Sequence, residues 1–179
     1  MIAGLVLGLI IAFTRVTTPF LIVPYGAVEG VFLGAVSYFA NQQYPGIALE
    51  AIIATLGCFF AVLWLYSINV LRATPAFVKI ISAALMGIAA LYLVSLVSRL
   101  FGHPLTFLHD SSTLSIGISV AVIIVASLSF VIDFAAIDEA VAQGVDSRQG
   151  WRFAFCLLVG LVWLYLEILR LLSKLRSRN

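Results

Sequence analysis

The stretch WRFAFCLLVGLVWLYLEILRLLSKL, residues 151–175, is a long apolar run with one acidic residue, Glu167, deep inside it. A helix needs about 20 mostly apolar residues to cross the hydrocarbon core of a bilayer, and this stretch is long enough. Glu167 follows Trp151 by 16 positions, which corresponds to about 24 Å along a helix. The stretch therefore predicts a membrane-spanning helix that carries a carboxylate at bilayer depth.

The whole chain has the same character. Of its 179 residues, 63% are hydrophobic and 10% are charged, whereas a soluble domain has about 45–50% apolar and about 25% charged residues. So few charged side chains cannot cover a water-exposed surface, and we expect the lipid bilayer to cover the rest. The net charge of +2 and the absence of a basic patch argue against a nucleic-acid partner.

Turn signals divide the chain into six apolar segments, which predict an all-α, polytopic membrane helix bundle. We expect one domain, residues 1–179, with a short basic tail at about 173–179. Thr74 suits an N-cap with Pro75 as the first helical residue, and Ser111, Ser112 or Thr113 can cap the fifth segment. The first segment is short for a full span. The segments run over about 1–14, 20–40, 47–70, 76–101, 113–141 and 151–175.

Two further patterns concern packing and orientation. Glycines recur every four residues at Gly26, Gly30 and Gly34, and also at Gly4 and Gly8, and such stripes are commonly helix contact surfaces in lipid.

Basic residues in the connections place the first, third and fifth connections in the cytoplasm. Basic residues near membrane helices tend to stay in the cytoplasm. A complete sixth span would carry the basic tail outside, so either that helix does not fully cross the membrane or the tail is an exception to this tendency.

Three acids, Glu29, Asp133 and Glu167, lie at bilayer depth, where a charge costs about 2.5–3.5 kcal/mol on insertion scales. Each has a structural alternative to a functional role. Glu167 can form an ion pair with Arg170 three positions later. Asp133 can instead only reach the lipid headgroups. Glu29 can hydrogen-bond to a neighbouring helix as a structural residue, or it can support a functional site.

Asp133 and Glu167 could work together if their helices are neighbours. Two like charges about 4 Å apart repel by about 4 kcal/mol at an effective dielectric constant of about 20. Such a pair would share a proton and act as a proton sensor near neutral pH. We hypothesise that the two states favour different helix arrangements: the ionised pair repels and loosens the last helix, and protonation closes it.

The stretch DFAAIDEAVAQG at 133–144, followed by LYLEILRLL at 164–172, resembles the last two helices of the Bax inhibitor family of transmembrane proteins. The run VEGVFLG at 28–34 resembles that family's third helix, and the similarity covers the whole chain and is closest to an actinobacterial branch. The resemblance implies seven helices with six around the last one, so the six segments would match the second to the seventh.

The resemblance also implies a function, because bacterial members behave as pH-regulated calcium leak channels. Their sensor, a pair of aspartates on the last two helices, falls on Asp133 and Glu167, so the second acid here is Glu, and the chain between the two acids is longer than expected. We expect Glu29 and Arg170 to support this pair. Calcium would be the permeant ion and would contact Asp133 and Glu167, with no cofactor.

The expected function is therefore a pH-regulated cation leak, for calcium, in a bacterial cell membrane that the chain crosses several times. The alternative is a regulatory protein without transport activity, which binds a membrane protease or a stress-response partner. An intramembrane aspartyl protease also needs two neighbouring acids, but the chain has no Gly-x-Gly-Asp motif. We expect no enzymatic activity.

Overall fold

Five long helices make up the part of the chain that the computed structural model describes, residues 19–101, 112–146 and 149–178, and these residues contain no strand. All five are long and apolar enough to cross a membrane, so the described part of the chain is all-helical and has the helices of a multi-pass membrane protein. The first predicted segment, residues 1–14, lies outside the described residues, and the count of six segments stays a prediction. The helices are α2 (Pro19–Gln43), α3 (Ile47–Ser67), α4 (Pro75–Leu100), α5 (Thr113–Ala142) and α6 (Gly150–Arg178).

Two of the helices begin where the sequence predicts. Thr74 accepts a hydrogen bond at its Oγ1 from the backbone N–H of Phe77, at 3.2 Å, and Pro75 is the first residue of α4. Ser112 caps α5, since its hydroxyl accepts a hydrogen bond from the backbone N–H of Ser115 at 3.3 Å. These caps satisfy backbone donors that the first turn of a helix leaves unpaired.

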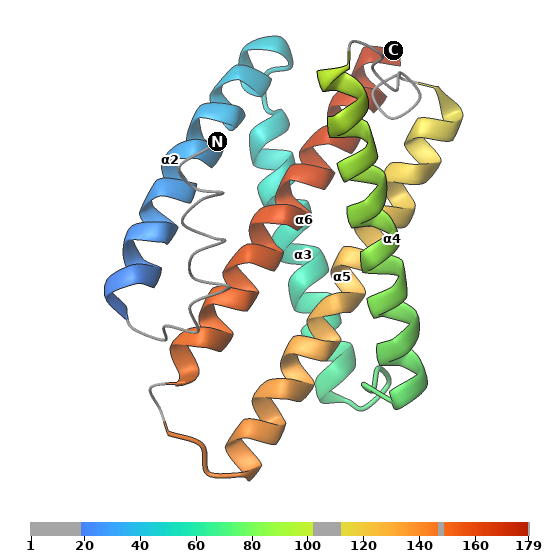
Figure 1. The fold of residues 1–179 in the computed structure, drawn as a ribbon. Coiled ribbons are helices and arrows are strands. Elements are labelled where there is room, and N and C mark those ends of the chain that lie inside the picture. Colours follow the sequence, from blue (N-terminus) through green and yellow to red (C-terminus); the bar gives the residue numbers. More distant parts are fainter. Residues whose placement is uncertain (1–18, 102–111, 147–148, 179) are drawn as a thin grey trace.

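The C-terminal helix α6 is the element that most of the bundle shares. It packs against α2, α3 and α5, while α3 also contacts α2 and α5, and α4 packs against α5. Figure 1 shows that α6 runs parallel to α2 and antiparallel to α5 along the full height of the bundle. Side chains on different faces of α6 can therefore reach several helices.

The centre of the bundle, between α3, α5 and α6, is tightly packed. Phe130, Val131 and Leu164 are fully buried there, and the ring of Phe59 meets that of Phe130 edge-on at 5.1 Å. A Cβ atom on Gly160 would lie 2.8 Å from the Phe130 ring, so glycine is required for this close approach of α5 and α6. The described helices therefore enclose a closed apolar centre.

The predicted glycine contact surface is present at one position among the described residues. A Cβ on Gly26 would lie 3.4 Å from Leu158 of α6, whereas one on Gly30 or Gly34 would have no neighbour within 4 Å. The prediction for Gly4 and Gly8 falls outside the described residues.

The basic tail predicted at about 173–179 continues α6 as helix to Arg178. Arg176 forms an ion pair with Glu50 at 2.5 Å and donates to the backbone carbonyl of Pro45 at 3.0 Å, which ties the end of α6 to the start of α3. Figure 1 shows this end of α6 opposite the connections that follow α3 and α5. The last helix therefore spans the height of the described bundle, and its crossing of the membrane stays a prediction.

Candidate functional site

Glu167 is the most deeply buried acidic side chain of the described residues, with 2% of its surface exposed. It lies on α6, and the hydroxyl of Tyr92 on α4 donates a hydrogen bond of 2.6 Å to its Oε1. Arg170 donates from Nη1 to both carboxylate oxygens, at 3.0 and 3.2 Å. A buried carboxylate is strongly destabilising without partners, and these donors compensate its charge.

Arg170 joins the two other residues of this cluster. Its Nη1 also donates to the Tyr92 hydroxyl at 3.1 Å, and its guanidinium carbon lies 5.5 Å from the centre of the Tyr92 ring. We call Tyr92, Glu167 and Arg170 the latch. Within the described residues, the hydrogen bonds between α4 and α6 all end on the Tyr92 hydroxyl, so the latch is the polar link between these helices.

The ion pair between Glu167 and Arg170 is the structural alternative that the sequence left open for Glu167. A spacing of three positions places both side chains on neighbouring parts of one helix surface. Arg170 remains 43% exposed whereas Glu167 is buried. The pair therefore joins a solvated cation to a carboxylate inside the bundle.

Asp133 lies on α5 and is half-buried. The contact between Phe130 and Gly160 fixes the register of the two antiparallel helices and places Asp133 opposite the region of residue 157. Glu167 is ten residues further along α6, which is about 15 Å. The structure therefore does not bring Asp133 and Glu167 together, and the predicted shared proton and shared calcium contact are not formed in this arrangement.

Glu29, predicted to support the acid pair, lies on α2 and is half-buried. The hydroxyls of Ser37 and Tyr165 are hydrogen-bonded at 2.6 Å and set the register of the parallel helices α2 and α6. The same register places Glu29, one turn after Tyr25, at about the level of Asp133. Glu29 is therefore closer in depth to Asp133 than to Glu167.

Lys174 is a buried polar residue that the sequence analysis assigned to the tail. Only 7% of its surface is exposed, and its ammonium group donates to the hydroxyls of Ser115 and Ser119 on α5, at 2.7 and 2.8 Å. Its position seven residues after Glu167 was a usable signal, because residues seven apart share one face of a helix. Tyr92 gave no comparable signal, because nothing in the sequence of α4 distinguishes it from an interfacial tyrosine.

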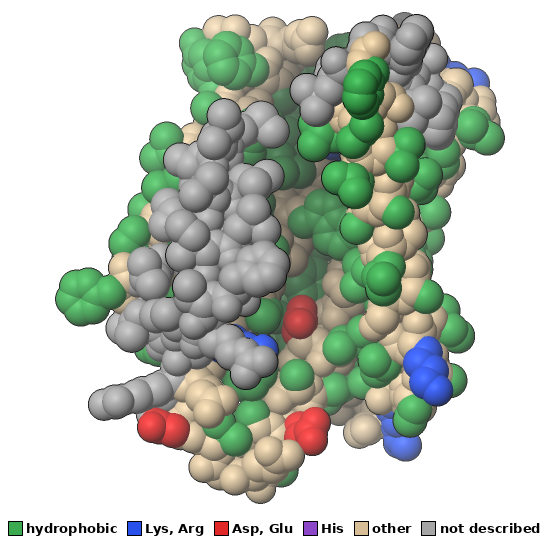
Figure 2. All heavy atoms as spheres, in the orientation of Figure 1, with side chains coloured by type: hydrophobic (Ala, Val, Ile, Leu, Met, Phe, Trp, Pro, Cys, Tyr) green, Lys and Arg blue, Asp and Glu red, His purple; other side chains and the backbone are tan. Residues whose placement is uncertain are grey.

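Figure 2 shows one face of the molecule, where charged side chains are few and the surface is hollowed beside α4. Among the described residues, no group of three or more His, Cys, Asp or Glu side chains could hold a metal ion. The described residues place a buried ion pair, Glu167 with Arg170, at a hydrogen-bonded link between two helices.

Comparison with known proteins agrees with this architecture. The family described as Bax inhibitor 1 like matches residues 1–177. The chain belongs to this family. No protein of curated function and no solved structure shows significant similarity to this Bax inhibitor 1 like protein. Family membership supports a multi-pass membrane protein, and the resemblance stated from the sequence is confirmed at the level of the family.

Proposed function

We propose that this Bax inhibitor 1 like protein is a pH-regulated cation leak of a bacterial cell membrane, and that the latch holds it closed. The observation that supports the proposal is the buried carboxylate of Glu167, bonded to Arg170 on its own helix and to Tyr92 on another. Calcium as the ion rests on the family resemblance. Its preference for oxygen ligands is compatible with carboxylates along the path.

The latch gives the pH response a direction, and this direction is opposite to the one expected for an acid pair. Ionised Glu167 binds the Arg170 guanidinium through charge-assisted hydrogen bonds of 3.0 and 3.2 Å, which are stronger than neutral ones. Protonation of Glu167 removes the negative charge that this pairing needs. The ionised carboxylate therefore holds α4 to α6 through Tyr92 and Arg170, and the neutral carboxyl group holds this link less strongly.

Asp133 has a different role in this proposal. It is half-buried near the middle of α5, about 15 Å along the bundle from Glu167. In the open arrangement each carboxylate offers oxygen ligands to a passing cation at its own level. Glu167 thus controls opening and also contacts the ion, whereas Asp133 contacts the ion without controlling the opening.

Calcium flux into liposomes tests the proposal. For the purified chain in liposomes that enclose a calcium indicator, we expect calcium entry to increase about tenfold or more as the pH falls from 8 to 6. Glu167→Gln should leak at both pH values, because a neutral amide cannot hold Arg170 by charge. The matched variant Asp133→Asn should lower the flux at every pH and keep its pH dependence.

The same measurement separates the alternative function. A chain that passes no calcium at any pH between 6 and 8 would contradict the leak and favour the regulatory protein that binds a membrane partner. A flux that decreases on acidification would contradict the direction assigned to the latch.

A further inference from the structure

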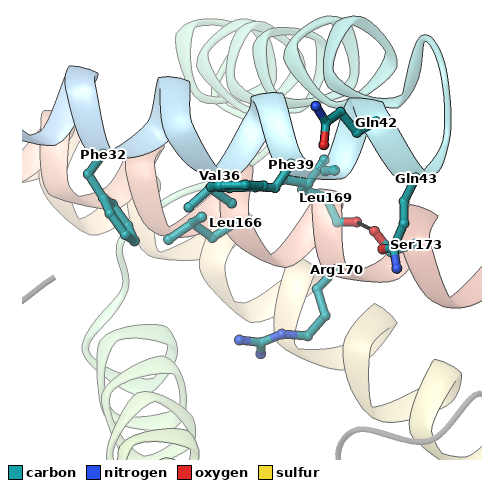
Figure 3. Close-up of a pocket in the computed structure, with 10 residues that line it drawn as sticks. Phe32, Val36, Phe39, Gln42, Gln43, Leu166, Leu169, Arg170 and Ser173 are labelled. Carbon is teal, nitrogen blue, oxygen red and sulfur yellow. Dashed lines mark hydrogen bonds between the residues drawn. The ribbon is translucent and has the colours of Figure 1, made fainter.

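A groove of about 880 Å³ lies between α2 and α6, and its lining changes from apolar to polar along its length. Phe32 and Val36 of α2 and Leu166 of α6 line the apolar part, and in Figure 3 these side chains lie between the two helices. The polar part is lined by Gln42, Gln43, Arg170 and Ser173. Because α2 and α6 run parallel in register, these polar residues share one end of the groove.

The dimensions of the groove match one leaflet of a bilayer. Phe32 and Gln43 are eleven residues apart on α2, which is about 16 Å along the helix, and half of the hydrocarbon core is about 15 Å thick. Gln43 is the last residue of α2, so the polar end lies where the helix leaves the apolar layer. An acyl chain fits the apolar part while its headgroup stays at the polar end.

The charge at the polar end selects the headgroup. Arg170 is 43% exposed, and its hydrogen bonds with described residues all come from Nη1, which leaves the Nε and Nη2 donors for another acceptor. Guanidinium donors suit the paired oxygens of a phosphate. Arg176 and Arg178 follow on the same end of α6. Basic sites between membrane helices favour anionic headgroups.

We propose that the groove between α2 and α6 binds an anionic phospholipid, with its phosphate at Arg170 and an acyl chain along Phe32, Val36 and Leu166. The phosphate then shares the Arg170 guanidinium with Glu167, because it binds the Nε and Nη2 donors that the latch does not use. Resting on the proposed function, this sharing gives the lipid a role as an activator, because a second anion on Arg170 weakens the attraction between Arg170 and Glu167.

Native mass spectrometry of the full chain in detergent tests the binding without measuring flux. With phosphatidylglycerol and phosphatidylcholine titrated separately, we expect the anionic lipid to be retained about tenfold more tightly. Arg170→Gln should remove this preference, whereas Arg152→Gln, at an exposed position near the other end of α6, should keep it.

A second variant leaves the latch intact. The side chain of Gln43 is exposed and makes no hydrogen bond with the described residues, so Gln43→Glu should fold normally. It should weaken the binding of phosphatidylglycerol and leave that of phosphatidylcholine unchanged. The proposed lipid site would be contradicted if the unmodified chain retained the two lipids equally, or if Gln43→Glu kept the same preference. A groove already filled by another segment of the chain would also contradict it. None of these results depends on whether the protein conducts calcium.

Discussion

Arg170→Gln is expected to lower the free energy of unfolding by about 2–3 kcal/mol at pH 8, because it leaves the charge of Glu167 buried without its cation. Removing one partner of a buried ion pair costs about 3–5 kcal/mol, and the partial exposure of Arg170 places this variant below that range. The Tyr92 hydroxyl remains as a donor to Glu167. Thermal unfolding in detergent measures the loss.

Two comparisons make this expectation specific. The double variant Glu167→Gln with Arg170→Gln should recover most of the stability, since no buried charge is left. Arg152→Gln, on an exposed part of α6, should leave the free energy of unfolding nearly unchanged. An equal loss in this control would show that the ion pair between Glu167 and Arg170 does not stabilise the protein.

Lys174→Met is expected to lower the free energy of unfolding by about 1–3 kcal/mol, because it leaves two buried hydroxyls without their donor. Ser115 is 0% and Ser119 3% exposed, and both accept hydrogen bonds from the Lys174 ammonium group. Methionine has nearly the same shape as the lysine stem, so packing changes little. The variant therefore isolates the polar contribution, which thermal unfolding again measures.

The controls for Lys174 follow from the same contacts. Combining Lys174→Met with Ser115→Ala and Ser119→Ala should restore stability, because an apolar cluster needs no donor. Lys79→Met, at an exposed position on α4, should have little effect. If the triple variant is less stable than Lys174→Met alone, the serine hydroxyls are not the groups that the lysine stabilises.

The membrane helices could be predicted from the sequence because hydrophobic length and turn chemistry are local properties. Thr74, Pro75 and Ser112 begin their helices as expected, since a capping hydroxyl acts within one turn. The end of α6 was harder to predict. Lys174 and Arg176 have the composition of a solvated tail, but partners on α5 and α3 hold them in the helix.

The site could be predicted only in part, because helix register is not a local property. Glu167 was expected to be buried and to have Arg170 as a partner, and it has both features. Its expected pairing with Asp133 is wrong for this arrangement, since the packing of Phe130 on Gly160 sets a register that separates the two acids. Tyr92 comes from a different helix, and only tertiary structure brings its hydroxyl to Glu167.

The central claim is that the latch between α4 and α6 holds the bundle closed. The rate at which the Tyr92→Phe variant admits calcium tests this claim most directly. This change keeps the ring beside Arg170 and removes only the hydroxyl that bonds Glu167 at 2.6 Å and Arg170 at 3.1 Å. Losing a hydrogen bond to a charged group should raise the open fraction about tenfold or more. Tyr38→Phe, which removes a hydroxyl bonded to Gln42 within α2, is the matched control. We predict that at pH 8 Tyr92→Phe admits calcium into liposomes as fast as the unmodified chain does at pH 6, and a rate equal to that of the unmodified chain at both pH values would contradict the account.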